Sequence, residues 1–277
     1  MEIVCLIDNQ KKDPNLESEH GLALWVVNGD FRILFDTGAT GKLVENAVKL
    51  GVSLEKVDLA IISHGHRDHG GGLESFLKLN PTAPVYMNRG AGKKHIKMDK
   101  GSFKDISLDE DVLENYANRI HFLSGPVQLT ENLHILTSIK QNHDVPDGNQ
   151  LLYEVSGTKL VPDNFSHELV MVVEKEDGLV VFTGCSHKGI LNILGTVMEH
   201  FPDTPLLTVF GGLHLMIPPD DSTIHPVKLE MMAGQLENYP LGRIYTGHCT
   251  GTSNYHFLKR IMADRIEYFA TGSRVVL

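Results

Sequence analysis

Cysteine and basic residues are scarce in this chain of 277 residues, and each shortage excludes a class of protein. Three cysteines are too few, and odd in number, for a disulfide framework, so we expect a protein of the reducing cytoplasm. Lys and Arg together number 25 against 35 Asp and Glu, which gives a formal net charge of −10. A nucleic-acid partner is therefore not expected, because phosphate backbones need clustered Lys and Arg.

Long apolar segments are absent as well. No stretch of about eighteen apolar residues occurs, so neither a membrane-spanning helix nor a membrane partner is predicted. The amino terminus, Met1 to Asn9, has the pattern of a first β-strand and not of a signal peptide. The chain does contain 42% hydrophobic residues, which suffices for the core of one domain over residues 1 to 277.

The apolar residues alternate between short runs and helical spacing, which predicts an α/β protein. The predicted strands, after the first, are 22–27, 31–35, 57–62, 84–87, 169–174, 179–183, 206–210, 244–246 and a closing strand. The predicted helices are 41–50, ended by Gly51, and 72–79, 188–200, 227–237 and 254–264.

A dense group of metal-binding residue types follows the apolar run Leu59–Ile62. Residues 64 to 69 read His-Gly-His-Arg-Asp-His, and three glycines come next. A loop at the end of a strand can turn the first two histidines to one side and the aspartate and last histidine to the other, so it can serve two cations roughly 3.5–4 Å apart. Neutral imidazoles with a carboxylate suit Zn²⁺, Mn²⁺ or Fe better than Ca²⁺ or Mg²⁺. A histidine-rich surface loop is the alternative interpretation. The predicted ligands are His64, His66, Asp68 and His69.

This motif after an apolar strand resembles the signature of the metallo-β-lactamase fold, whose members are mostly two-metal hydrolases. Phe35-Asp36-Thr37-Gly38 is similar to the first motif of that superfamily, in which an aspartate braces the metal loop. Taken alone, the tetrapeptide also fits an aspartic protease, but that enzyme needs two paired carboxylates and only one Asp-Thr-Gly occurs here. The resemblance implies an αββα four-layer sandwich with the metals at one edge of the sheets.

A cysteine departs from the pattern of the superfamily. Strand 179–183 ends in Gly-Cys185 where the superfamily usually has Gly-Asp. Cys185 either supplies a thiolate to one metal or lies beside the site while His187 coordinates. Thr-Gly-Cys-Ser-His followed by Lys-Gly-Ile resembles a narrower branch, whose members are named dihydropterin-aminobenzene-ribofuranosyl-phosphate synthases or simply metal-dependent hydrolases. That branch favours His187 as the third histidine, with His167 as the alternative that the wider superfamily uses.

Two further histidines follow strands in the second half of the chain. His248, in Gly-His-Cys-Thr-Gly, resembles the fifth motif of the superfamily, whose histidine closes the second metal. His214, in Gly-Gly-Leu-His-Leu, fits the narrower branch and is predicted to face the substrate, where it stabilises charge or passes a proton. The alternative for His214 is a ring held by hydrogen bonds under a loop. The other histidines are predicted to be surface or packing residues: His20, His95, His121, His134, His143, His200, His225 and His256.

Segment 89–118 breaks the strand and helix rhythm and is predicted to be an insertion. Five lysines fall within twelve positions, and an acidic run, Asp109–Asp111, follows them. They either form a lid that meets an anionic substrate or cover a solvated surface with no ligand. The lysines are Lys93, Lys94, Lys97, Lys100 and Lys104.

The resemblance implies a dinuclear metal-dependent hydrolase that acts through a metal-bridging hydroxide. We expect two divalent metal ions, most simply Zn, and a small anionic substrate such as a phosphorylated or cyclic ester. Asp68 would hold the second metal and orient the hydroxide, and His214 would assist the leaving group. The first alternative is a metal-assisted transferase that joins a dihydropterin-methyl pyrophosphate to an aminobenzene ribofuranosyl phosphate. The second is a metal-bound ligand sensor without turnover.

Overall fold

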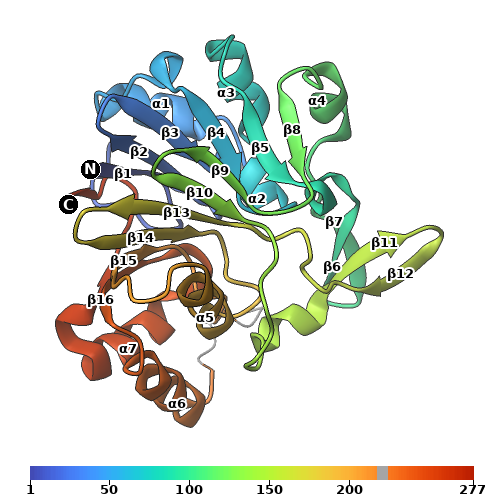
Figure 1. Cartoon of the computed structure of the whole chain (residues 1–277). Coiled ribbons are helices and arrows are strands. Elements are labelled where there is room, and N and C mark those ends of the chain that lie inside the picture. The colour runs from blue at the N-terminus through green and yellow to red at the C-terminus, as the bar shows by residue number, and fades with distance from the viewer. Residues whose placement is uncertain (217–223) are drawn as a thin grey trace. The chain divides into compact units, whose positions relative to one another are not determined.

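The computed structural model describes residues 1–216 and 224–277, which form two compact units (Figure 1). The first unit consists of Met1–Ile96, Asp105–Ser124 and Phe269–Leu277. The second consists of Lys97–Lys104 and Gly125–Tyr268. The prediction of one domain is not tested by this division.

The first unit contains a seven-stranded sheet. In spatial order its strands are β18 (Arg274–Val276), β1 (Glu2–Ile7), β2 (Ala23–Asn28), β3 (Phe31–Phe35), β4 (Leu59–Ile62), β5 (Val85–Asn88) and β8 (Ile120–Leu123). A two-residue turn with Gly29 at φ 63° joins β2 to β3, as the sequence pattern predicts. From β3 to β8 neighbouring strands are parallel, so the ends of β3 and β4 meet at one edge of the sheet.

Helices cover one face of this sheet. Leu43 and Ala47 of α1 are buried one turn apart, and Phe76 of α3 joins them in a cluster with Leu34 and Ala60 of the strands. Gly51 adopts a φ of 71° just past α1, which ends the helix as predicted. The helices of this unit are α1 (Lys42–Lys49), α2 (Arg67–Gly70), α3 (Leu73–Leu79) and α4 (Glu110–Asn115).

The second unit contains another seven-stranded sheet. In spatial order its strands are β17 (Ile266–Tyr268), β16 (Leu241–Thr246), β15 (Leu206–Phe210), β14 (Gly178–Thr183), β13 (Val170–Lys175), β10 (Leu133–Leu136) and β9 (Val127–Thr130). Strands β14 to β17 are parallel to one another, whereas β13 and β10 are antiparallel to their neighbours. The ends of β14, β15 and β16 therefore lie at the same edge.

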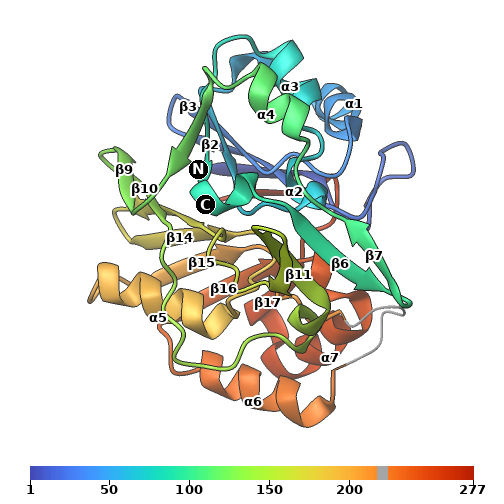
Figure 2. The same cartoon turned by 90° about the vertical axis from the view of Figure 1, so that its right-hand side faces the viewer.

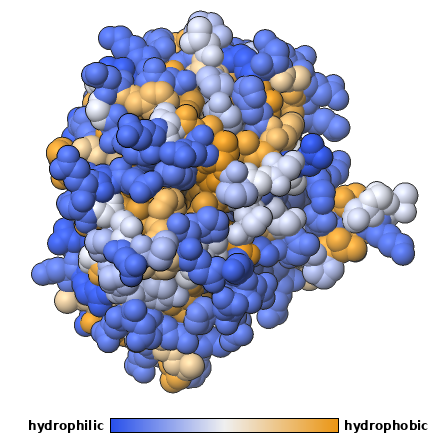
Figure 3. Space-filling model, in the orientation of Figure 1, coloured by the Kyte–Doolittle hydropathy of each residue, from blue (hydrophilic) through white to orange (hydrophobic). Residues whose placement is uncertain are grey.

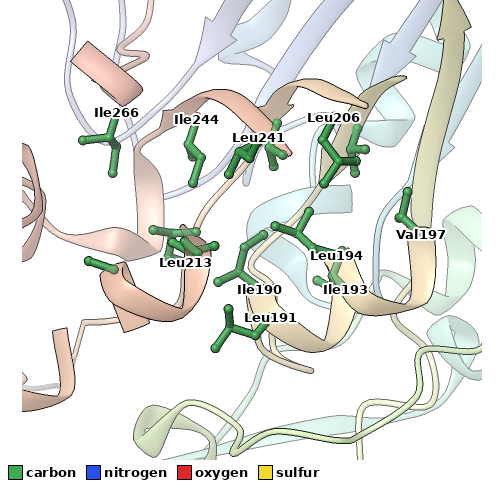
Figure 4. Close-up of a cluster of buried hydrophobic side chains, with 14 of the residues drawn as sticks. Ile190, Leu191, Ile193, Leu194, Val197, Leu206, Leu213, Leu241, Ile244 and Ile266 are labelled. Atoms are coloured by element: carbon green, nitrogen blue, oxygen red, sulfur yellow. The ribbon is translucent and has the colours of Figure 1, made fainter. Parts of the chain in front are cut away.

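The helices of the second unit pack on this sheet. They are α5 (Ile190–His200), α6 (Pro226–Leu236) and α7 (Thr252–Met262). Ile193 and Leu194 of α5 are fully buried in one cluster with the strand residues Leu206 and Ile244 (Figure 4). Helix α6 lies beside α5 and α7 (Figure 2).

A smaller sheet and several single turns complete the described structure. The sheet has the order β12 (Lys159–Pro162), β11 (Leu152–Ser156), β6 (His95–Asp99) and β7 (Ser102–Asp105). The 3₁₀ turns are η1 (Leu54–Lys56), η2 (Arg89–Gly92), η3 (Asp147–Leu151), η4 (His248–Thr250) and η5 (Ala263–Arg265).

The predicted elements are present, but some of them differ in extent or number. The predicted closing strand is two strands. β17 pairs with β16 in one sheet, and β18 pairs with β1 in the other. Segment 89–118, predicted as an insertion, holds the β6–β7 hairpin and α4. Strand β16 also begins earlier than predicted, at Leu241.

The surface is mostly hydrophilic in the view of Figure 3. Apolar atoms are visible at its lower edge, where α6 lies, and Val227 and Met231 of that helix are exposed. No helix in the described part of the chain has the length and hydropathy needed to cross a membrane.

Candidate metal centre

The first pair of predicted ligands in the first unit is His64 and His66. Both side chains are buried in the loop that follows β4, and Nε2 of His64 lies 3.1 Å from Nδ1 of His66. Two nitrogen ligands at about 2.0–2.1 Å from one tetrahedral ion lie roughly 3.3 Å apart. The spacing of this pair therefore fits one shared cation.

The second pair is Asp68 and His69, both in the single turn of α2. Oδ2 of Asp68 lies 3.7 Å from Nε2 of His69. The His69 side chain is fully buried, whereas the Asp68 side chain is 20% exposed. An oxygen and a nitrogen at this separation can also share a cation, so the loop presents two donor pairs.

Asp36 braces this loop from the end of β3. Its Oδ1 accepts the backbone N–H of Ser63 at 2.7 Å, and its Oδ2 accepts the Ser63 hydroxyl at 2.8 Å. Oδ2 also lies 2.6 Å from Nδ1 of His69, so this nitrogen carries the proton and donates it. Nε2 of His69 is thereby left as the lone-pair nitrogen. A carboxylate behind an imidazole is the usual device that orients a metal-ligating histidine.

The glycines after the motif let the loop pack on the Asp36 segment. A Cβ on Gly71 would lie 2.2 Å from the carbonyl oxygen of Ala39, and one on Gly72 would lie 2.2 Å from that of Thr37. The backbone N–H of Thr37 donates to the carbonyl of His69 at 2.7 Å. Any larger residue at these glycines would push the metal loop away from its brace.

Three loops meet in the second unit because β14, β15 and β16 are parallel neighbours. They carry Cys185, His214 and Cys249, whose donor atoms all lie within 4.8 Å of one another. The Ser186 hydroxyl donates to the carbonyl of Gly212 at 2.7 Å and ties two of the loops together. A Cβ on Gly212 would lie 2.3 Å from Sγ of Cys249, so only glycine fits there.

Backbone strain coincides with the motif loops of both units. Asp36 and Ser186 have a φ of 59°, His214 has 48° and His248 has 49°. Non-glycine residues in this region cost of order 1–3 kcal/mol each and persist where function needs them. His248 itself is buried and directly follows Gly247 at the end of β16.

His187 and His167 are both oriented by polar side chains within the second unit. Nδ1 of His187 lies 2.9 Å from the Asn149 side-chain oxygen, and its ring stacks on Phe165. For His167, Nε2 lies 3.1 Å from a carboxylate oxygen of Asp163. Both arrangements are of the kind that fixes a metal-ligating imidazole. The choice of His187 as the third histidine stays a prediction.

His214 lies beside His187, with ring centroids 4.1 Å apart. Both of its ring nitrogens are buried, and one lies close to Cys249. Within the described residues, His214 is thus next to candidate ligands and away from the bulk surface. This position is consistent with a residue that acts on a bound substrate.

Cys249 is a site residue that the sequence analysis did not assign. Burial raises the pKa of its thiol, but the Cys185 side chain, His248 and His214 lower it, and the net pKa is well below the ordinary value. By contrast, burial and the nearby Asp8 raise the pKa of Cys5, which is typical of an inert buried thiol. Its adjacency to His248 is the one sequence signal that points to Cys249.

Two other histidines contact the predicted ligands of the first unit. His95 is buried, and its ring packs on His66 with centroids 5.4 Å apart. His20 is exposed, and its Nε2 lies 3.4 Å from Oδ2 of Asp68. Neither histidine belongs to a local motif, so no spacing rule could have found these contacts.

The lysine-rich insertion is partly neutralised by its own carboxylates. Nζ of Lys94 lies 3.2 Å from Asp105, and Lys104 pairs with Asp99. Both lysines are largely exposed, so these pairs contribute little to stability. They leave less free positive charge for an anionic substrate than the sequence alone suggests.

Glu168 supports the Cys185 loop from inside the protein. Its buried carboxylate accepts the backbone N–H of His187 at 2.7 Å and that of Lys188 at 2.8 Å. Burial raises the pKa of Glu168 from 4.5 to about 7, although these hydrogen bonds oppose the rise. The carboxyl group is therefore protonated in the folded protein at a pH where the unfolded chain has already lost its proton.

A pH dependence of stability follows for the metal-free protein. Between about pH 5 and pH 8 the folded state binds more protons at Glu168 than the unfolded state. The free energy of unfolding therefore falls by about 2 to 3 kcal/mol as the pH rises through this range. Urea unfolding in the presence of a chelator measures this, with Glu168→Gln as the matched variant. As the pH rises through this range, the free energy of unfolding of the wild type should fall by that amount relative to that of Glu168→Gln. A constant difference between the two proteins would show that Glu168 does not titrate in this range.

Comparisons with known proteins show the family of this chain. Residues 19–248 match the profile of the metallo-beta-lactamase superfamily, and the chain belongs to this family. The class defined by the fold and the site is therefore that of metal-binding proteins which are usually hydrolases. The predicted α/β fold of metallo-β-lactamase type is confirmed.

The chain is also similar to individual proteins of this superfamily. A crystal structure of Tm1679, described as a metal-dependent hydrolase of the beta-lactamase superfamily, is 30% identical with a TM-score of 0.84, covering 100% of this chain and 99% of that one. The 7,8-dihydropterin-6-methyl-4-(beta-D-ribofuranosyl)-aminobenzene-5'-phosphate synthase of Methanocaldococcus jannaschii is 27% identical, over 84% of this chain and 82% of its own length. Zn²⁺-bound PqqB of Methylobacterium extorquens is 10% identical with a TM-score of 0.60, covering 100% of both chains, and shares the fold alone. The predicted resemblance to the narrower branch is thus confirmed.

Proposed function

We propose that this chain is a dinuclear metal-dependent hydrolase of small phosphorylated or cyclic esters. The observation that carries the proposal is the buried Asp36–His69 pair beside the donor pair Asp68 and His69. A carboxylate that fixes the tautomer of an imidazole has a clear purpose when that imidazole binds a cation. The proposed ligands are His64, His66, Asp68 and His69 of the first unit, and Cys185, His187 and His248 of the second.

The donor set suits a borderline cation such as Zn²⁺. It combines neutral imidazoles with a carboxylate and a thiol, whereas Ca²⁺ and Mg²⁺ take oxygen ligands almost exclusively. The buried Cys185 at the place of the usual aspartate adds a soft donor and favours Zn²⁺ over Mn²⁺.

Two cations held by these ligands would supply a water molecule acidified toward neutral pH and would polarise the ester. The protein's own groups do the rest. Asp36 keeps the proton of His69 on Nδ1, so Nε2 stays available as a ligand throughout. Asn149 holds the His187 ring in the same way. His214, whose ring lies beside that of His187, would donate a proton to the leaving oxygen.

A second candidate function is group transfer. The 27% identical relative is named a synthase whose product joins a dihydropterin-methyl group to an aminobenzene ribofuranosyl phosphate. The same cations would then assist the departure of pyrophosphate, and a nitrogen or carbon nucleophile would replace water. The relative that is described as a metal-dependent hydrolase, at 30% identity over the whole chain, favours hydrolysis.

Metal removal and product analysis test the proposal. We expect about two metal ions per chain by elemental analysis, loss of p-nitrophenyl phosphate and bis(p-nitrophenyl) phosphate turnover after chelation, and recovery with Zn²⁺. Two metals with no hydrolysis of any ester, but release of pyrophosphate in the presence of both pterin and aminobenzene substrates, would support the transferase. A chain that binds no metal after reconstitution would contradict both functions.

A further inference from the structure

The second unit contains a cavity of about 730 Å³ to which the sequence analysis assigned no role. Its walls come from the loop that begins at Gln141, the start of α5, the segment around Leu213 and helix α6. Pockets that bind small organic molecules typically measure about 300–1,000 Å³. The cavity is therefore large enough for a fused-ring compound.

The floor of this cavity is apolar. Ile190, Leu191 and Leu213 are buried and lie next to one another (Figure 4), and all three line the cavity. At its lip, Met231 and Met232 of α6 contribute thioether side chains. Methionines are flexible and make favourable contacts with aromatic rings, so this lining fits a flat aromatic group better than a polar one.

The rim carries hydrogen-bonding groups but little free positive charge. Among the lining residues that the structure describes, Lys228 is the one cation, and its Nζ lies 2.6 Å from a carboxylate oxygen of Asp147. The side-chain amides of Gln141 and Gln235 and the carboxylate of Asp144 also line the rim. Phosphate groups need unpaired cations or clustered N–H donors. This rim instead suits an uncharged ring with polar atoms at its edge.

The wall of the cavity leads directly to candidate catalytic residues. The lining loop continues into Gly148 and Asn149. The side-chain oxygen of Asn149 lies 2.9 Å from Nδ1 of His187, and its side-chain nitrogen donates to the carbonyl of His187 at 2.7 Å. A Cβ on Gly148 would lie 3.0 Å from Nε2 of His214. Leu213 lines the cavity and directly precedes His214, and Gly189 lines it two positions after His187.

A buried amide holds this loop in place. The Asn192 side chain is 2% exposed, and its oxygen accepts the backbone N–H groups of Asn142 and His143, each at 2.7 Å. Its nitrogen donates to the carbonyls of His143 and Lys188. The cavity wall is thus fixed to α5 before any ligand binds, which lowers the entropic cost of binding.

We propose that this cavity binds an uncharged aromatic or heteroaromatic ring of the substrate, while the charged ester group of the same molecule reaches the metal ligands. That the ring belongs to a substrate rests on the proposed hydrolase function; the ring-binding property of the cavity does not. The natural substrate is then an ester of a ring compound and not of a short aliphatic alcohol.

Two variants of one helix test the proposal on the metal-loaded full-length protein. Met231→Glu places a charge at the lip of the cavity, whereas Val227→Glu places the same charge one turn earlier on α6, outside the lining. Both positions are exposed, at 61% and 51%, so neither variant should unfold the protein. Thermal unfolding followed by circular dichroism checks this.

Dye binding tests the cavity proposal, and ester turnover tests the hydrolase proposal. Nile red, an uncharged planar dye, should bind the wild type with increased fluorescence, and Met231→Glu should weaken its binding about tenfold because the bound dye would exclude water from the new carboxylate. The KM for 1-naphthyl phosphate should rise by a similar factor, with the KM for ethyl phosphate unchanged. Val227→Glu should change none of these values.

Each outcome has a definite meaning. Equal effects of the two variants on the dye, or no dye binding at all, would overturn the cavity proposal. Selective loss of dye binding in Met231→Glu, in a protein that holds two metals yet hydrolyses neither ester, would support the cavity as a ring-binding site and contradict the hydrolase.

Discussion

Replacement of His66 by Ala is expected to remove one metal ion from each chain and to lower ester hydrolysis by at least about 100-fold. Its Nδ1 is 3.1 Å from Nε2 of His64, so the variant leaves a single nitrogen where two now converge. Loss of an outer partner of a metal ligand already costs 10–100-fold in affinity or activity, and loss of the ligand itself should cost more. Elemental analysis and turnover on the same samples measure both effects.

His256→Ala is the matched control for this experiment. His256 is an exposed histidine on α7 whose ring packs beside that of Tyr255, so its loss should change neither metal content nor turnover. A His66→Ala protein that keeps two metals and full activity would remove His66 from the site. A protein that keeps two metals but loses activity would show that His66 acts on the substrate and not on a cation.

Much of the fold could be predicted because the motifs terminate strongly patterned strands. The run Leu59–Ile62 is buried at all four positions, and a continuous apolar run of this length is typical of a central parallel strand. The alternation of such runs with helical spacing was enough to place α1, α3 and α5 within two residues. The candidate metal-binding loop could be predicted because its donor residues are close together in the sequence.

The parts of the site that escaped prediction depend on neighbours in space. Cys249 reaches Cys185 only because β14 and β16 flank β15 in one parallel sheet, and strand order is not encoded in local spacing. The same holds for Asn149, which contacts His187 across 38 positions of the sequence, and for His95, which packs on His66. Lone residues of this kind have no periodicity that a sequence pattern can detect.

The closing strand shows a different limit. Its apolar residues fit either sheet, and the chain in fact divides them between β17 and β18. The local alternation of apolar residues does not specify the edge strand with which each of them pairs. β18 pairs with β1 in one sheet, and β17 pairs with β16 in the other.

Replacement of Asp36 by Ala is expected to destabilise the metal-free protein by about 3 to 5 kcal/mol, because it leaves buried donors without their charged partner. The carboxylate accepts the N–H and the hydroxyl of Ser63 and Nδ1–H of His69, and all of these groups are fully buried. Metal affinity should also fall about 10–100-fold, since nothing then holds the His69 ring in its ligand orientation. Urea unfolding with chelator and zinc titration measure the two effects separately.

Asp36→Asn and Thr37→Ala distinguish a brace for the metal ligand from ordinary packing. Asparagine keeps one acceptor oxygen for Ser63 but loses the charge opposite His69, so it should recover part of the stability and little of the metal affinity. The Thr37 hydroxyl donates to the carbonyl of His69 at 3.1 Å, a neutral hydrogen bond worth about 1 kcal/mol. If Asp36→Ala cost no more than Thr37→Ala and left zinc affinity unchanged, the carboxylate would have no part in orienting His69. The expected order, with zinc affinity lost in both Asp36 variants and kept in Thr37→Ala, assigns the effect to the charge behind the imidazole.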